Sequence, residues 1–396
     1  MRTILSKVKA KIHAVDSLLH PVVEESNCLK DSILNQGIPN ALFFSWDDLK
    51  KRILHFVSEM QSESDYEFKY SNSTETCCIY NSVYVCMILS LFNEICNKEK
   101  SFIHGWLRYF DSYQEKETGF FTDERIVNNY WTTADWWGAR HLCPHIINAY
   151  TALGGKPKYE FNWVKEYYNL NILKNKLDTC NWDCFIPDEN DIDNFIMNVG
   201  CILQYQRDFW NDQKADTAVT FLKDYLRKCI NKETGFWGTF DPTNNMERCR
   251  MIQFSYHLFR IFFNDKEYIA YPERIIDNIL LSQNKLGGWG NKLNSSACED
   301  IDALNILTYI SSQNDYRKED VKRAIEYSMI FVLANQNEDG GFVFRRDEPL
   351  WYGSTVMSSM KNESAMFPTW FRLLCLAYMC KYLGIGNFKF VDCPGY

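Results

Sequence analysis

The stretch QNKLGGW at residues 283–289 recurs with small changes at three other places in the chain: QNEDGGF at 336–342, KETGFW at 232–237 and KETGFF at 116–121. Gly235, Gly288 and Gly341 follow one another at intervals of 53 residues. A repeat of about 50 residues indicates one supersecondary unit copied in series, because a single unit cannot bury its own apolar face. These turns therefore predict a repeat architecture.

The spacing predicts two more turns. Gly119 precedes Gly235 by 116 residues, which is close to two repeats and leaves room for one turn between them. We place that turn at the sequence NWD of residues 181–183, and extrapolation towards the N-terminus places another near residues 66–68. Six repeats are enough to close a ring.

Between the turns, apolar residues recur every three or four positions, as at Ile275, Ile276 and Ile279, which is the period of an α-helix. Each repeat has room for an outer and an inner helix, and strand signals are almost absent. The predicted fold is all-α: an (α/α)6 toroid, or barrel, of six helical hairpins over 41–396, after an N-terminal helical extension over 1–40. We expect outer helices at 46–59, 102–113, 162–173, 216–230, 272–282 and 318–334. We expect inner helices at 76–96, 133–153, 193–210, 247–263, 300–311 and 363–383.

Composition excludes some partners and locations. The formal net charge is -8, and no stripe of Lys and Arg alternates with aromatic residues, so we expect no nucleic-acid partner. The 15 cysteines lie mostly within apolar helical patterns, which is typical of reduced, buried thiols. No run of 18 apolar residues and no signal-peptide pattern occurs, so we expect a cytoplasmic protein.

The N-terminal segment has two interpretations. Residues 1–19 place Arg2, Lys7, Lys9 and Lys11 among apolar residues at helical spacing. Such a basic amphipathic helix either packs on the ring with its basic face in solvent, or lies on an anionic membrane surface. The second interpretation would make the protein membrane-peripheral.

The Gln-x3-Gly-Gly-Trp and Gln-x3-Gly-Gly-Phe turns resemble the Gln-Trp repeats of the terpenoid cyclase and protein prenyltransferase α/α toroid superfamily. The resemblance is strongest over 232–383 and extends by period from about residue 75. The superfamily includes squalene and hopene cyclases, class II diterpene cyclases, prenyltransferase β-subunits and many uncharacterised bacterial proteins. The chain resembles a bacterial-type member with squalene-hopene cyclase-like repeats.

A catalytic motif of this family has a partial counterpart at the start of a predicted inner helix. Class II cyclases carry Asp-x-Asp-Asp, in which a carboxylic acid protonates an alkene or an epoxide. Asp300-Ile301-Asp302 matches the first three positions, and Ala303 stands where the last Asp is expected. The resemblance implies Asp302 as the general acid and Asp300 as its partner. Acids at a helix start also serve as caps and interact with the helix dipole, which is the structural alternative.

The zinc ligands of the prenyltransferases are not matched. The resemblance would require an Asp-x-Cys pair at the same inner helix and a later histidine, but Asp302 replaces the cysteine and the histidine is missing. His141, His145, Cys180 and Cys184 are donor types that bind zinc, yet their His-x3-His and Cys-x3-Cys spacings are unspecific. We expect no metal and no cofactor.

Aromatic and charged residues near the predicted inner-helix starts are candidates for substrate binding. Ring faces stabilise carbocations and also stack on sugars, and Arg binds diphosphates or acidic sugars. Packing between helices and solvated helix ends are the structural alternatives. The candidates are Trp136, Trp137, Trp351, Tyr352, Phe367, Trp370, Glu363 and Arg248.

Three functions fit these residues. The first is a terpenoid cyclase-like enzyme that cyclises an isoprenoid or a related lipid after protonation by Asp302. The second is a carbohydrate-active (α/α)6 enzyme, a glycosidase or polysaccharide lyase, in which two carboxylates such as Asp302 and Glu363 flank a glycosidic bond. The third is a non-catalytic toroid that binds a lipid or a partner protein.

Overall fold

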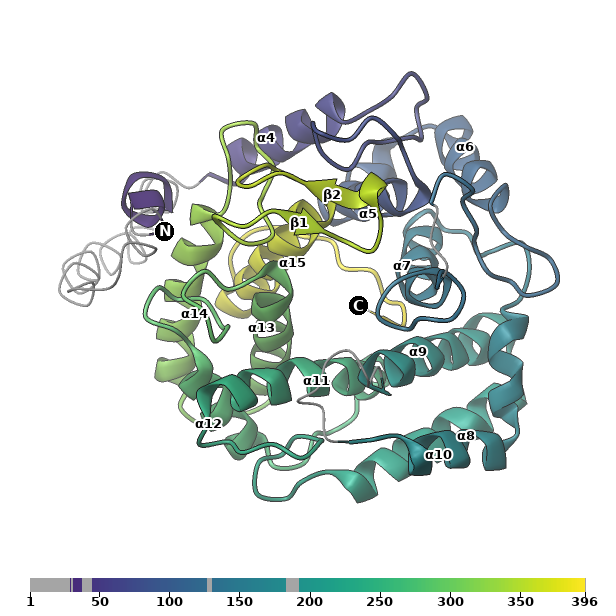
Figure 1. Cartoon of the computed structure of the whole chain (residues 1–396), viewed down its shortest axis with the longest axis vertical. Helices are drawn as coiled ribbons and strands as arrows, with labels where there is room; N and C mark the ends of the chain where they lie inside the picture. Colours follow the sequence, from purple (N-terminus) through teal and green to yellow (C-terminus); the bar gives the residue numbers. More distant parts are fainter. Residues whose placement is uncertain (1–28, 30, 38–44, 127–129, 183–191, 396) are drawn as a thin grey trace.

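The helices form a ring in the computed structural model, which describes residues 29, 31–37, 45–126, 130–182 and 192–395 (Figure 1). Each inner helix contacts the next one along the chain, and the last inner helix contacts the first. The predicted all-α (α/α)6 toroid is confirmed. The inner helices are α5 (Ile79–Leu91), α7 (Ala139–Ala152), α9 (Ile192–Trp210), α11 (Asn245–Asn264), α13 (Ala297–Ser311) and α15 (Met366–Leu383).

The outer helices lie around the outside of the ring of inner helices (Figure 1). Three of them, α4, α12 and α14, have the predicted bounds. The outer helices are α4 (Trp46–Glu59), α6 (Lys100–Asp111), α8 (Leu170–Thr179), α10 (Gln213–Cys229), α12 (Pro272–Ser282) and α14 (Lys318–Ala334). Shorter elements are η1 (Ile33–Gly37), η2 (Ile95–Asn97), η3 (Asn162–Tyr168), η5 (Thr355–Met357), β1 (Leu350–Trp351) and β2 (Ser358–Ser359).

The inner helix predicted at 76–96 spans only Ile79–Leu91. Two other predicted helices differ from the structure for local reasons. The outer helix predicted at 162–173 is divided into η3 and α8, because Asn169 is extended and its side chain accepts a hydrogen bond from Asn171 N, which starts a new helix. The inner helix predicted from residue 133 begins only at Ala139, because Gly138 has a φ of 107°, which no α-helical residue adopts.

The glutamine of each repeated turn binds backbone carbonyls. Gln283 Nε2 donates to Gly287 O at 3.1 Å and to Ala324 O, on the next outer helix, at 2.9 Å. Gln336 Nε2 makes the equivalent bond to Gly340 O at 3.0 Å. The Gln-x3-Gly spacing therefore closes each of these two turns, and Gln283 also joins its turn to the following hairpin.

The first glycine of each Gly-Gly pair has the left-handed conformation that the turn requires. Gly287 and Gly340 have φ of 98° and 92°, and Gly235 has φ of 79°. These three positions are structurally equivalent, so the repeat is 52 and then 53 residues. The uniform spacing of 53 that the second glycines suggest is wrong by one residue.

The structure describes all of the turn predicted near residues 66–68, but only part of the turn predicted at 181–183. The turn near residues 66–68 is confirmed, because the same antiparallel bridge recurs there and in two other repeats. The bridges are Gln61–Phe68, Gln114–Phe121 and Gln336–Phe342. Of the turn at 181–183, Asp183 lies outside the described residues, and Trp182 Nε1 donates to Leu177 O at 3.0 Å.

The last repeat closes on the first. Met366 N, at the start of α15, donates to Tyr70 O at 2.8 Å. Arg52 of α4 donates to Asn337 O at 2.9 Å, and this carbonyl belongs to the last Gly-Gly-Phe turn. Residues almost 300 positions apart in sequence are therefore adjacent in the ring.

Only part of the N-terminal extension lies within the described residues, and the predicted amphipathic helix of residues 1–19 lies outside them. The described part packs on the outside of α14, where Ile33 joins a cluster with Ile330 and Phe331. Ser32 Oγ donates to Ala334 O at 3.0 Å. Across the described ranges, no helix combines the length and apolar character needed to span a bilayer.

Candidate active site

Asp300 and Asp302 face different sides of α13, because residues two positions apart in an α-helix are turned by about 200°. Asp300 Oδ1 accepts hydrogen bonds from Trp289 N at 2.8 Å and Ser295 Oγ at 2.7 Å. Its other oxygen forms an ion pair with Arg372 of α15, and both side chains are completely buried. Burial raises the pKa of Asp300, and the Arg372 guanidinium opposes that shift.

The bond from Trp289 to Asp300 has counterparts in two other repeats. Trp237 N donates to Ser255 Oγ at 3.0 Å, and Phe342 N donates to Thr369 Oγ1 at 2.9 Å. In each repeat, a polar side chain of the inner helix accepts the backbone N–H of the turn aromatic. Asp300 therefore occupies a position that holds turn and helix together.

Asp302 has different surroundings. Its side chain is 5% exposed and has no hydrogen-bond partner among the described residues. Burial raises the pKa of Asp302 well above the usual value of an aspartate, with the Glu299 and Asp193 carboxylates adding to the rise and the Arg250 guanidinium opposing it. Burial therefore favours the protonated form of the Asp302 carboxyl more than in an ordinary aspartate.

Asp193 provides a second carboxylate close to Asp302. It lies at the start of α9 and is completely buried. Its Oδ2 atom is 3.1 Å from His257 Nδ1 and 3.5 Å from an Arg250 nitrogen. Arg250 and His257 are seven residues apart on α11, so they share one face of that helix. Three inner helices thus bring two carboxyl groups, an imidazole and a guanidinium together.

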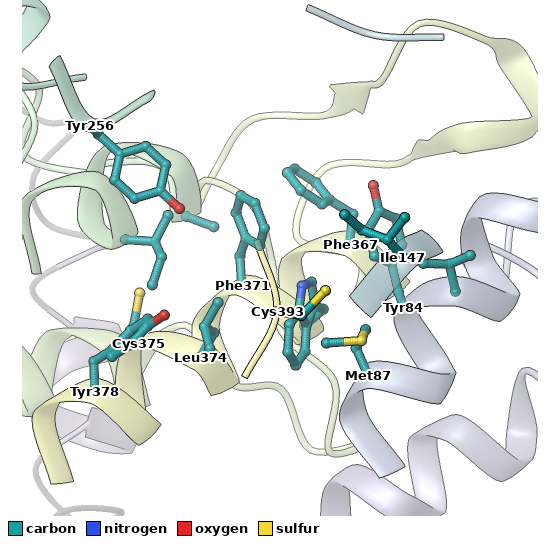
Figure 2. Close-up of a cluster of buried hydrophobic side chains, with 14 of the residues drawn as sticks. Tyr84, Met87, Ile147, Tyr256, Phe367, Phe371, Leu374, Cys375, Tyr378 and Cys393 are labelled. Carbon is teal, nitrogen blue, oxygen red and sulfur yellow. The ribbon is translucent and has the colours of Figure 1, made fainter. Parts of the chain in front are cut away.

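Aromatic rings fill the neighbouring part of the ring interior. Phe367 stacks on Tyr352 with ring centres 4.3 Å apart and planes 9° apart, and lies 4.3 Å from Phe371 and 5.5 Å from Tyr84. Figure 2 shows Tyr84 of α5, Tyr256 of α11 and Phe367 and Phe371 of α15 within one cluster. These faces could receive a flat apolar group or an electron-poor carbon.

His141 and His145 of α7 lie beside these rings. Their Nε2 atoms are 3.4 Å apart, and Tyr80 Oη is 3.1 Å from His141 Nδ1. Burial lowers the pKa of His145 to about 3 and that of His141 well below its usual value, with the charges of His145 and His257 adding to the shift of His141. Both imidazoles are therefore neutral at physiological pH.

Cys184, one of the four zinc-type donors, lies outside the described residues, and Cys180 is half-buried. Within the described part of the chain, no three or more His, Cys, Asp or Glu side chains are arranged to hold a metal ion.

The predicted tryptophans have different placements. Trp137 is completely buried and stacks on Tyr80, with ring centres 6.0 Å apart. Trp370 of α15 is also buried, and Trp136 packs against Trp137 at 6.2 Å. Trp351 of β1 is 55% exposed. The structure therefore brings Tyr352 and Phe367 together but leaves Trp351 on the surface.

Glu363 and Arg248 bind backbone groups of loops. The Glu363 carboxylate accepts hydrogen bonds from Ser73 N and Met360 N, both at 2.6 Å. The Arg248 guanidinium donates to Pro242 O at 2.6 Å and to a carbonyl at the end of α12 at 3.2 Å. These bonds stabilise loop conformations, and Arg250, not Arg248, contacts the buried carboxylate of Asp193.

Sequence reasoning missed Asp193 and His257 as site residues. A usable signal exists, because Asp193, Arg250 and Asp302 all lie in the first two turns of successive inner helices. In a closed ring of parallel inner helices, such positions converge at one end. Comparing equivalent positions between repeats would therefore have grouped these residues.

No protein-family model matches the chain, and no curated protein matches it in sequence. Solved structures with a similar path of the chain include a type II terpene cyclase from Scytonema. The two chains are 12% identical, the match covers 85% of this chain and 97% of the other, and the TM-score is 0.48. An unsaturated glucuronyl hydrolase from Streptococcus agalactiae has 11% identity over 89% and 96% of the two chains, at a TM-score of 0.47. A polysaccharide lyase has 11% identity over 86% and 99%, also at 0.47. Such identities carry no information about the reaction.

Proposed function

We propose that the protein is an enzyme that uses Asp302 as a general acid on an isoprenoid substrate bound against the aromatic cluster. The observation that carries the proposal is the Asp302 carboxyl, which is buried, has no hydrogen-bond partner among the described residues and has a pKa raised by that burial. A proton donor must be protonated at the working pH and free to reach its acceptor. Asp300 takes no part in proton transfer in this proposal, since both of its oxygens are engaged.

The raised pKa of Asp302 selects the proton acceptor. A carboxyl that holds its proton tightly is a weak acid, so an epoxide oxygen is a better acceptor than an unactivated alkene. Transfer of the proton to this oxygen accompanies cleavage of one C–O bond, whose electron pair stays on the oxygen. The π electrons of a neighbouring alkene then form a C–C bond to the electron-poor carbon. Loss of a proton from the final cation completes a net isomerisation.

Two groups would assist this reaction. The Arg250 guanidinium, which opposes the rise in the pKa of Asp302, stabilises the carboxylate that proton transfer leaves behind. The faces of Phe367, Phe371 and Tyr84 lie near enough to one another to stabilise a cation between them.

The test is incubation of the purified protein with isoprenoid epoxides and with the corresponding alkenes, followed by product analysis by mass spectrometry. We expect cyclic isomers from an epoxide, and at least about a 100-fold loss of product with Asp302→Asn. Asp224→Asn on the exposed face of α10 is the matched control and should leave turnover unchanged. Absence of product from every epoxide, or equal turnover by Asp302→Asn, would contradict the proposal.

Asp193 favours a second candidate function, hydrolysis of a glycosidic bond. Asp302, whose raised pKa favours the acid form, and Asp193 would supply the acid and base pair that such hydrolysis needs, and Asp193 replaces Glu363 in this role. Here Asp193→Asn and Asp302→Asn should each reduce hydrolysis of aryl glycosides about 100-fold. Failure of the wild-type protein to cleave any aryl glycoside would exclude this candidate.

A further inference from the structure

Residues 388–395, which follow α15, run back into the middle of the ring (Figure 1). This segment first passes the end of α5, where Lys389 N donates to Leu91 O at 2.9 Å. It then passes α15, where the centre of the Phe390 ring lies 5.1 Å from that of Tyr378. The segment therefore enters the ring from the C-terminal ends of the inner helices.

The far part of this segment is buried and is bonded to α7. Cys393 is 2% exposed and belongs to the buried cluster drawn in Figure 2, and Pro394 is buried too. Thr151 Oγ1 donates to Cys393 Sγ at 3.3 Å. Asn148 Nδ2 donates to Pro394 O at 2.9 Å and to Pro144 O at 2.7 Å. These bonds hold the segment in one position inside the ring.

The segment ends just below the aromatic cluster, that is, on the side towards the C-terminal ends of the inner helices. Asn148, which bonds to Pro394, is three residues after His145 on α7, or about 4.5 Å along the helix axis. The centre of the His145 ring is 5.6 Å from that of Tyr84 and 6.5 Å from that of Phe371. On the α7 side, about one helical turn therefore separates the segment from these rings.

Asp302 lies at the same height in the ring as Phe371. Asp300 and Thr369 each accept the backbone N–H of the turn aromatic in their own repeat. Asp302 and Phe371 each follow two residues later, so they occupy equivalent positions on α13 and α15. In a ring of parallel inner helices, equivalent positions lie at one height. Below Asp302, an apolar chain therefore meets the segment after a short distance.

We propose that residues 388–395 set the length of the isoprenoid chain that binds at Asp302, an inference that rests on the proposed function. A chain that lies against Tyr84 and Phe371 ends at Cys393 and Pro394, which are both buried. A chain with further isoprene units has no room beyond them. The substrate class is therefore a short acyclic isoprenoid, such as a farnesyl chain, and not a chain as long as squalene.

Binding of isoprenoid alcohols, which lack the epoxide, tests the length limit separately from the reaction. The full chain is titrated with geraniol, farnesol and geranylgeraniol, and binding is followed by tryptophan fluorescence. We expect the wild type to bind farnesol at least about tenfold more tightly than geranylgeraniol, because one excess methylene in a closed apolar site already costs about tenfold.

Two variants should move the length limit in opposite directions. The double variant Cys393→Ala, Pro394→Ala shortens two buried side chains and should bind geranylgeraniol at least about tenfold more tightly than the wild type does. Cys393→Met lengthens one side chain and should weaken farnesol binding by about tenfold or more. Asp392→Ala is the matched control, because Asp392 belongs to the same segment but its side chain is 86% exposed. It should bind all three alcohols as the wild type does.

A variant counts only if its melting temperature stays near that of the wild type, and if the double variant melts lower, Cys393→Met decides alone. Equal binding of farnesol and geranylgeraniol by the wild type, or an unchanged length preference in the variants, would overturn the inference. Failure of the proposed function gives a different result, since no epoxide is then converted while the length limit in binding remains. Binding of none of the three alcohols would contradict both.

Discussion

Asp300 and Asp302 are separated by one residue, yet the helix turns them into different environments. Asp300 is paired with Arg372 and accepts two further hydrogen bonds. Asp302 is buried with no hydrogen-bond partner among the described residues, and this burial raises its pKa. The same side chain therefore stabilises the ring at one position and favours its protonated form at the other.

This difference predicts different effects of two asparagine variants on stability. The folded-state pKa of Asp302 is raised, so the folded protein binds more protons than the unfolded chain above about pH 4, and wild-type stability falls as pH rises. Asp302→Asn removes this loss. Relative to the wild type, the variant should gain stability as the pH rises above about 4, by at most about 1.4 kcal/mol for each pH unit.

Urea unfolding of the wild type and Asp302→Asn at several pH values is the measurement. Asp300→Asn is the comparison, because it leaves Arg372 as a buried charge without its partner and should cost about 3–5 kcal/mol at neutral pH. If the stability of Asp302→Asn follows that of the wild type in parallel at all pH values, Asp302 is not the titrating group.

At the scale of elements, the turn between an outer and an inner helix joins neighbouring hairpins. Gln283 reaches Ala324 on the next outer helix, and Gln336 donates to Gly340 O within the last turn. The glycine of the last turn approaches another helix so closely that a Cβ atom on Gly340 would lie 2.0 Å from Arg52 O. A glycine there is needed both for its positive φ and for this contact.

Two alanine variants separate these causes. Gly384, after α15, also has a positive φ of 67°, but a Cβ atom there would meet nothing within 4 Å. Gly384→Ala therefore measures the cost of the conformation alone, about 1 kcal/mol. Gly340→Ala should cost about 1–3 kcal/mol more, because the Arg52 backbone must move. Equal losses in thermal or urea unfolding would show that the close approach is unimportant.

The whole molecule is a closed ring, which distinguishes it from an open solenoid of the same repeats. α15 contacts α5, and Arg52 and Met366 carry hydrogen bonds across the seam. In an open array each repeat contacts only its neighbours and the ends unfold first. In a ring there is no end, so the hairpins support one another all the way round.

Weakening the seam should therefore destabilise the whole protein. Arg52→Ala removes a charged hydrogen bond to Asn337 O and should lower the free energy of unfolding by about 1.5–3 kcal/mol, without separating the transition into two. Circular dichroism and tryptophan fluorescence during urea unfolding should give the same lowered midpoint. Lys174→Ala, at an exposed i,i+4 ion pair on α8, is the control and should change stability by less than about 1 kcal/mol. Two separated transitions in Arg52→Ala would contradict a ring that unfolds as a unit.

The sequence by itself determined the all-α ring. Its glutamines, glycines and turn aromatics act through local bonds, and the apolar period between them is a property of each helix alone, so α4, α12 and α14 have their predicted bounds. Which side chains meet at the site was decided only by the tertiary structure, because Asp193, Arg250, His257 and Asp302 come from three helices. The roles of Asp300 and Glu363 also depended on partners distant in sequence, namely Arg372 and Ser73. These side chains meet only because the ring closes, and a local sequence pattern does not show how the ring closes.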